Sequence, residues 1–137
     1  MFFVYYCIVV TMKDKAFLTP VDERLYTEIS SYLKKIGIED VFLEGSAKKT
    51  SAYEDIDLIA VGDVESIAAA IGGIYGYKQE RNGKEIPTLS SYLGRKVRVL
   101  SDEPNVPYVS RNVKRRVMIE VSSDEKSTIF DINFLPA

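Results

Sequence analysis

Two short apolar runs, residues 41–44 and 56–61, flank one polar loop, and this pattern restricts the fold more than any other feature of the chain. Short runs of this kind predict strands. A segment with helical periodicity precedes the first run, and another follows the second. The order helix, strand, loop, strand, helix predicts an α/β (α+β) domain.

Both helical segments have clear end signals. The first predicted helix begins after the capping residue Thr19, with Pro20 at its first position, and ends at Gly37. Its apolar residues share one face and should point to the core: Val21, Leu25, Ile29, Leu33 and Ile36. The second predicted helix begins after Asp63. Its inward face comprises Val64, Ile67, Ile71 and Ile74, and it should end among Gly72, Gly73 and Gly76.

The C-terminal half has a pattern rich in strands and turns. A polar loop over 48–51 and a turn at 81–84 are both expected. The later features are, in order, a strand at 96–100, an interruption at Pro104 and Pro107, and a C-terminal β-hairpin formed by 116–121 and 128–135.

At 137 residues, the chain is expected to form a single domain, 1–137. Residues 1–11 are either an extra strand or an N-terminal extension, with Met12 as an alternative native start. The apolar run 2–10 is too short to span a membrane, which takes about 20 residues, and no basic residue precedes it. We therefore expect no membrane association.

Composition excludes several classes of function. The 18 Lys and Arg against 20 Asp and Glu give a net charge of −2, which argues against general nucleic-acid binding. The absence of histidine excludes Ser-His-Asp and Cys-His catalysis. A single cysteine, Cys7, excludes an internal disulfide and fits a cytoplasmic location.

The chemistry of the chain is concentrated around two acidic residues. Asp55 and Asp57 alternate along a predicted strand, so both carboxylates project to the same side. Mg²⁺ takes carboxylate, phosphate and water oxygens, and two such ions can stabilise phosphoryl transfer. Gly45 would allow close backbone approach, and Ser46 could hold a triphosphate beside those ions. In the simpler alternative, the two acids are the exposed face of an edge strand and Gly45-Ser46 is an ordinary turn.

These residues resemble the signature of the nucleotidyltransferase superfamily, which has the DNA polymerase beta-like fold, and especially its minimal nucleotidyltransferases. The signature is a hydrophobic residue with Gly-Ser, a short loop, and Asp-hydrophobic-Asp-hydrophobic. It is similar to Leu43-Glu44-Gly45-Ser46 and Asp55-Ile56-Asp57-Leu58. The chain departs from it in the loop: eight residues separate Ser46 from Asp55, and Lys48-Lys49-Thr50 stands in place of a glycine.

The resemblance implies an enzyme that transfers a nucleoside monophosphate, most plausibly AMP from ATP, to an acceptor hydroxyl and releases pyrophosphate. It implies a nucleotidyltransferase-like fold in which helices flank a mixed, twisted sheet. It also implies a two-ion Mg²⁺ site, with ATP or another nucleoside triphosphate as substrate. It also implies a third carboxylate on a later strand, for which Asp131 is preferred and Glu120 is the alternative. Gly45, Ser46, Lys48 and Lys49 would bind the nucleotide.

Other groups give weaker indications. The basic residues Arg111, Lys114, Arg115 and Arg116 could bind an acidic substrate or pyrophosphate, or form a solvated strand end. Tyr53 could stack on a base. The acceptor could be a small molecule, a partner protein or a toxin-like protein, and oligomer formation remains open. The main alternatives to an enzyme are a non-catalytic nucleotide- or partner-binding module with this fold and a purely structural α/β domain.

Overall fold

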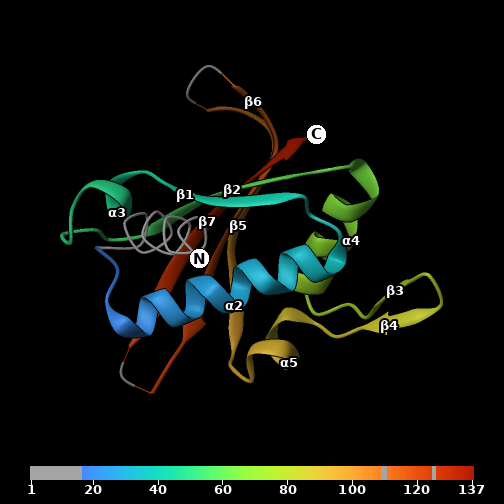
Figure 1. The fold of residues 1–137 in the computed structure, drawn as a ribbon, viewed down its shortest axis with the longest axis horizontal. Coiled ribbons are helices and arrows are strands. Elements are labelled where there is room, and N and C mark those ends of the chain that lie inside the picture. The colour runs from blue at the N-terminus through green and yellow to red at the C-terminus, as the bar shows by residue number, and fades with distance from the viewer. Residues whose placement is uncertain (1–16, 109–110, 125) are drawn as a thin grey trace, which may run out of the picture.

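The computed structural model describes residues 17–108, 111–124 and 126–137. These residues form a mixed α+β fold with a five-stranded sheet and a separate two-stranded sheet (Figure 1). The elements are, in order, α2 (Pro20–Ile36), β1 (Asp40–Glu44), α3 (Ser46–Lys49), β2 (Ile56–Gly62), α4 (Val64–Ile74), β3 (Gln79–Arg81), β4 (Lys84–Ile86), α5 (Leu89–Leu93), β5 (Val97–Tyr108), β6 (Arg111–Ser122) and β7 (Ser127–Pro136). Residues 1–11, expected to be a strand or an extension, lie outside the described part.

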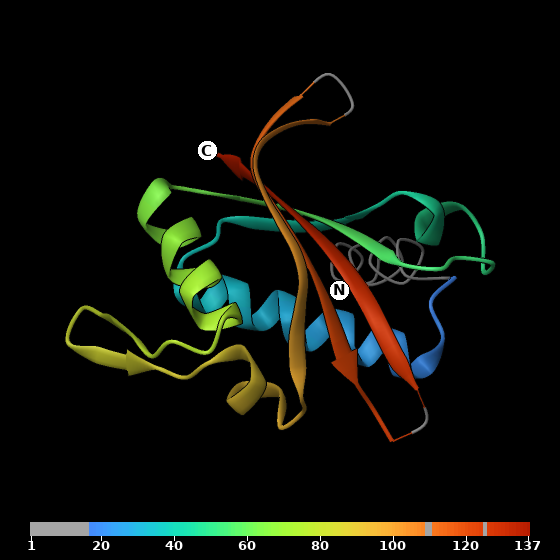
Figure 2. The same ribbon diagram turned by 180° about the vertical axis from the view of Figure 1, so that it is seen from behind.

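The large sheet is mixed, as the sequence predicted. Its strand order is β1-β2-β7-β6-β5, in which β2 and β7 are parallel and every other neighbouring pair is antiparallel. The predicted C-terminal hairpin is confirmed as β6 and β7, which pair from Arg115↔Phe134 to Ser122↔Ser127. The two strands β5 and β6 also extend together beyond the rest of the sheet (Figure 2).

The hydrophobic core lies on the side of the sheet that α2 crosses (Figures 1 and 2). Alternate strand residues contribute to this core: Ile56, Leu58 and Ala60 of β2, Val117, Ile119 and Val121 of β6, and Phe130, Ile132 and Phe134 of β7. Because neighbouring strand residues point to opposite faces, the residues between them project away from the core. Asp57, Arg116 and Asp131 are therefore on the opposite face of the sheet.

The helix ends agree with the sequence. The Thr19 side chain accepts a hydrogen bond from the Asp22 amide at 3.2 Å, and Gly37 closes α2 with φ of 119°. The Asp63 carboxylate caps α4 by accepting from the Ser66 amide at 2.7 Å. Leu25, Ile29, Leu33 and Ile36 of α2 are buried as predicted, and Val21 is half-buried.

The prediction for the inward face of α4 is wrong at Val64, which is 56% exposed. This residue lies in the first turn, and burial of the helix begins at Ser66 and Ile67. The end of the helix at Ile74 lies among Gly72, Gly73 and Gly76, as predicted. A Cβ at Gly73 would overlap the Tyr32 hydroxyl, so close packing against α2 accounts for that glycine.

Two other expectations are wrong. Residues 46–49 form the short helix α3, so the polar loop begins later than predicted. Pro104 and Pro107 lie within β5 and do not interrupt it. β5 is an edge strand, and proline is tolerated there because an edge residue can lack a backbone N–H without losing a ladder bond. The turn at 81–84 is confirmed between β3 and β4. Within the described residues, the helices are too short or too polar to cross a membrane.

Candidate active site

Three aspartates converge on the face of the sheet opposite the core. Each of Asp55, Asp57 and Asp131 offers a carboxylate oxygen, and these atoms all lie within 4.8 Å of one another. Asp57 and Asp131 are direct neighbours on the parallel strands β2 and β7. Asp55 immediately precedes β2 and, two positions from Asp57, projects to the same side. We call these three residues the acidic triad. The structure therefore brings together the three residues that the sequence reasoning selected.

Glu120, the alternative third carboxylate, is not part of this group. It lies opposite Ile129 in the β6–β7 register, and its Oε1 is 3.1 Å from Nη2 of Arg98 on β5. Glu120 therefore belongs to an ion pair between β6 and the edge strand β5.

The acidic triad concentrates negative charge in a partly desolvated place. Asp55 and Asp57 are half-buried, whereas Asp131 is 2% exposed. Burial, together with the nearby carboxylates of Asp55 and Asp131, raises the pKa of Asp57 to about 6, although the guanidinium of Arg116 acts in the opposite direction. Burial is the largest cause of this rise in pKa, and the two neighbouring carboxylates add to it.

Arg116 is the cation that the structure adds to the site. Its Nε donates to both carboxylate oxygens of Asp131 at 3.0 Å, and its Nη2 donates to Oδ2 at 2.6 Å. The hydrogen bonds to Asp131 raise the pKa of Arg116 further. With all four groups ionised, the site carries a charge of −3 + 1 = −2. This contact was not predicted from the sequence, because the register between two strands joined by a long turn cannot be derived from the sequence pattern.

The turn after β1 lies directly against Asp57. The antiparallel register places Glu44 opposite Asp57, so Gly45 follows at the edge of the acidic triad. Gly45 has φ of 76° and ψ of −157°, a region open essentially to glycine alone. A Cβ at this position would overlap the Asp57 carboxylate. Ser46 is exposed and begins α3.

Of the two predicted lysines, only Lys49 has a side chain that the structure describes. Lys49 is exposed in α3. The side chain of Lys48 lies outside the described part of the structure.

The predicted basic patch is not one surface. Adjacent residues in β6 point to opposite faces, so Arg115 and Arg116 separate. Arg115 binds Asp102, with Nε to Oδ1 at 2.7 Å and Nη2 to Oδ2 at 2.6 Å. Lys114 is exposed, and the side chain of Arg111 is outside the described part. Two of the four cations are therefore neutralised by carboxylates on different faces.

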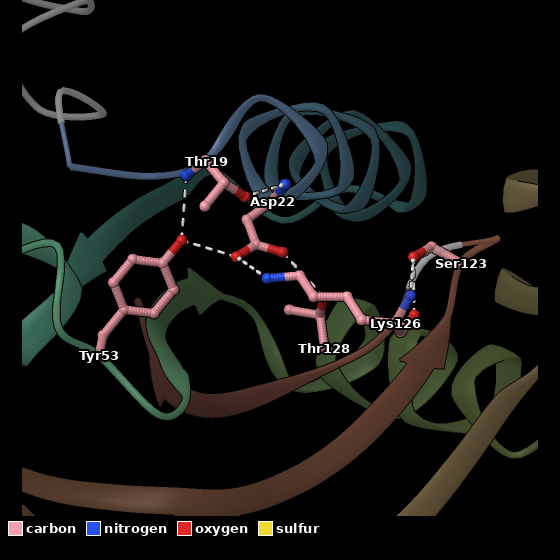
Figure 3. Close-up of polar contacts among 6 residues, drawn as sticks. All are labelled: Thr19, Asp22, Tyr53, Ser123, Lys126 and Thr128. Carbon is pink, nitrogen blue, oxygen red and sulfur yellow. Dashed lines mark hydrogen bonds and ion pairs between the residues drawn. The ribbon is translucent and has the colours of Figure 1, made fainter.

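Tyr53 lies in the loop before β2 and is half-buried. Its ring packs against the hydrophobic core, its hydroxyl donates to Oδ2 of Asp22 at 2.6 Å, and the same hydroxyl accepts from the Thr19 amide at 3.0 Å (Figure 3). The tyrosine is therefore part of the packing between this loop and the start of α2, and its stacking on a base stays a prediction.

Asn133 is a further polar residue near the site that the sequence reasoning did not select. It follows Asp131 by two positions in β7, is fully buried, and donates from Nδ2 to the carbonyl of Leu58 at 3.3 Å. Its Oδ1 has no hydrogen-bond partner among the described residues. The alternation of Asp131 and Asn133 in an otherwise apolar strand was the available signal.

In comparisons with known proteins, no family model, curated protein or solved structure matches this chain. The functional argument therefore depends on the residues of the site and their geometry.

Proposed function

We propose that this protein is a Mg²⁺-dependent nucleotidyltransferase that transfers AMP from ATP to an acceptor hydroxyl. The observation that carries the proposal is the convergence of the acidic triad within 4.8 Å, with Gly45 directly against Asp57 and Ser46 next in the chain. This arrangement agrees with what the resemblance in sequence implies: two acids on one strand, a third on a neighbouring strand and a Gly-Ser turn at their edge.

The residues present fit a divalent cation with hard oxygen ligands. Asp55, Asp57 and Asp131 supply only carboxylate oxygens, the donors that Mg²⁺ prefers. The raised pKa of Asp57 supports the same conclusion, because a bound cation would relieve the repulsion among the three carboxylates. Because Gly45 has no side chain, its backbone can lie directly against the Asp57 carboxylate. When bound, Mg²⁺ would balance the charge of the phosphates and stabilise the leaving oxygen.

Each residue of the site then has a role in the transfer. Gly45 and Ser46 bind the phosphates through the backbone and the hydroxyl. The acceptor oxygen forms a bond to the α-phosphorus, the bond from that phosphorus to the bridging oxygen breaks, and pyrophosphate leaves with the electron pair. Asp131 takes the proton of the acceptor hydroxyl, and Arg116 orients the Asp131 carboxylate through hydrogen bonds from Nε and Nη2.

Arg116 also defines the second candidate function. Because it engages both oxygens of Asp131, the site could bind a nucleotide without transferring it. The loop of eight residues between Ser46 and Asp55 favours the same alternative. A non-catalytic nucleotide- or partner-binding module of this kind would bind ATP but release no pyrophosphate.

The proposal is tested by calorimetric titration of ATP with Mg²⁺ into the protein and into Asp57→Ala. We expect saturable, Mg²⁺-dependent binding that Asp57→Ala abolishes. Asp40→Ala is a matched control, because Asp40 is an exposed acid on the neighbouring strand β1 and lies outside the triad. Absence of binding with all four nucleoside triphosphates would contradict the proposal.

A pyrophosphate assay separates the two candidates. Candidate acceptors are a small molecule, a partner protein or a toxin-like protein, and each can be added to the protein with ATP and Mg²⁺. Release of pyrophosphate supports the enzyme, whereas binding without release supports the module.

A further inference from the structure

Asp22 is a fully buried carboxylate in the first turn of α2. Its Oδ1 accepts from the Thr128 hydroxyl at 2.8 Å, and its Oδ2 accepts from the Tyr53 hydroxyl at 2.6 Å and from Nζ of Lys126 at 3.0 Å (Figure 3). Burial raises the pKa of Asp22, but these three hydrogen bonds outweigh it and hold the pKa below its ordinary value. A first-turn acid usually faces water, so a buried one with three side-chain partners calls for an explanation beyond helix capping.

Two of the three donors belong to the segments that lead into the acidic triad. Tyr53 precedes Asp55 by two residues, and Thr128 precedes Asp131 by three. Thr128 lies in β7, where the strand ladder already fixes the neighbouring backbone. Tyr53 lies in the loop between α3 and β2, which has no such support.

Asp55 is the member of the triad that the sheet does not hold. The ladder between β2 and β7 begins at Ile56, so it includes Asp57 and Asp131 but not Asp55. Within the described residues, the other hydrogen bonds of the loop 50–55 are local, from the Thr50 amide to the Ser46 carbonyl and from the Ala52 amide to the Thr50 hydroxyl. Among the described residues, the Tyr53 side chain joins this loop to a distant part of the molecule through Asp22, the Thr19 amide and the core.

We propose that Tyr53, held by the buried Asp22, is a positioning residue for Asp55. The hydroxyl fixes the loop so that the carboxylate of Asp55 reaches the metal position beside Asp57 and Asp131. The inference rests on the proposed function, because it assumes that the acidic triad binds a divalent cation.

Tyr53→Phe is the direct test, because it removes only the hydroxyl and leaves the ring in the core. Tyr32→Phe is the matched control. Tyr32 is fully buried, and its hydroxyl donates to the Pro87 carbonyl at 2.7 Å, a contact between α2 and the segment before α5. Tyr53→Phe loses two hydrogen bonds of the hydroxyl and Tyr32→Phe loses one, but only the bonds of Tyr53 are attached to the loop of Asp55.

Two measurements report on the site independently of any reaction. Calorimetry gives the affinity for Mn²⁺, and the luminescence lifetimes of bound Tb³⁺ in H₂O and D₂O give the number of water molecules on the ion. We expect Tyr53→Phe to weaken Mn²⁺ binding by about tenfold, the lower end of the range for residues that orient metal ligands. The number of bound waters should rise by about one or two, because a lost carboxylate gives up one or two oxygen ligands. Tyr32→Phe should leave both values unchanged while lowering the melting temperature.

A double variant tests whether Tyr53 acts through Asp55. Asp55→Asn alone should raise the number of waters on Tb³⁺, and adding Tyr53→Phe should raise it no further. If Tyr53→Phe raises the number of waters on Tb³⁺ equally in the unaltered protein and in the Asp55→Asn variant, the inference is wrong.

The remaining outcomes separate the inference from the proposed function. If the unaltered protein binds neither Mn²⁺ nor Tb³⁺, both are overturned. If it binds both ions and Tyr53→Phe binds them equally well with the same hydration, only the inference is overturned. The inference is also overturned if the two tyrosine variants weaken ion binding equally, because the hydroxyl of Tyr53 would then contribute to stability alone.

Discussion

Burial and neighbouring negative charge both raise the pKa of the Asp57 carboxyl. It lies half-buried between Asp55 and Asp131, and only Arg116 opposes the rise of its pKa to about 6. In the metal-free protein, the folded state therefore keeps a proton that the unfolded state loses between the ordinary pKa of 3.8 and about 6. The free energy of unfolding contributed by Asp57 falls as the pH rises through this window.

Asp57→Asn should remove this pH dependence. Measured by urea unfolding with EDTA, the variant should gain stability relative to the unaltered protein between about pH 4 and pH 7, by roughly 1–2 kcal/mol once the exposure of the half-buried carboxyl is allowed for. If the variant exceeds the unaltered protein in free energy of unfolding by the same amount at about pH 4 and at about pH 7, Asp57 has an ordinary pKa in the folded protein.

At the scale of elements, the pairing of β1 with β2 positions the turn that carries Gly45. The register Glu44↔Asp57 leaves no room for a side chain at the next position, because the backbone of Gly45 lies against the carboxylate. The conformation of Gly45 adds to this requirement, since its φ of 76° and ψ of −157° are unfavourable for any other residue.

Gly45→Ala should therefore be costly, and Gly83→Ala provides the comparison. Gly83 also has φ of 76°, but a Cβ there meets nothing within 4 Å. We expect Gly83→Ala to lose about 1 kcal/mol from backbone strain, and Gly45→Ala to lose about 3 kcal/mol and to bind Mn²⁺ weakly. Equal losses in urea unfolding, with Mn²⁺ binding intact in both, would show that Asp57 tolerates a neighbouring side chain.

At the scale of the whole molecule, one face of the large sheet carries the hydrophobic core and the other carries the acidic triad. Residues on the face that α2 crosses form the hydrophobic core, and the acidic triad with Arg116 lies on the opposite face. Stability and site chemistry are coupled through β2 and β7, since both strands contribute to both faces.

This coupling predicts that a bound cation stabilises the entire fold. A ligand present at 100 times its dissociation constant adds about 2.7 kcal/mol to the free energy of unfolding. Saturating Mg²⁺ should therefore raise the melting temperature by roughly 5–10 °C for a domain of this size, and EDTA should reverse the effect. Asp57→Ala should show no such shift. A similar shift in both proteins would assign the stabilisation to cations bound elsewhere.

Features set by neighbours in the chain were predictable from the sequence. Thr19 and Asp63 cap their helices because a side-chain oxygen reaches an amide three residues away. The C-terminal hairpin and the common side of Asp55 and Asp57 follow from strand periodicity. Val64 is an exception, because a helical face does not show where along the helix burial begins.

The tertiary structure decided which distant residues meet. It placed β7 beside β2, which brings Asp131 and not Glu120 to Asp57, and it brought Arg116 onto Asp131. It also buried Asp22, a first-turn acid that the sequence marks only as a favourable helix start. Local preferences act over a few residues, whereas strand order and register are fixed by how apolar side chains from the whole chain fill one core, and the sequence pattern alone does not determine that packing.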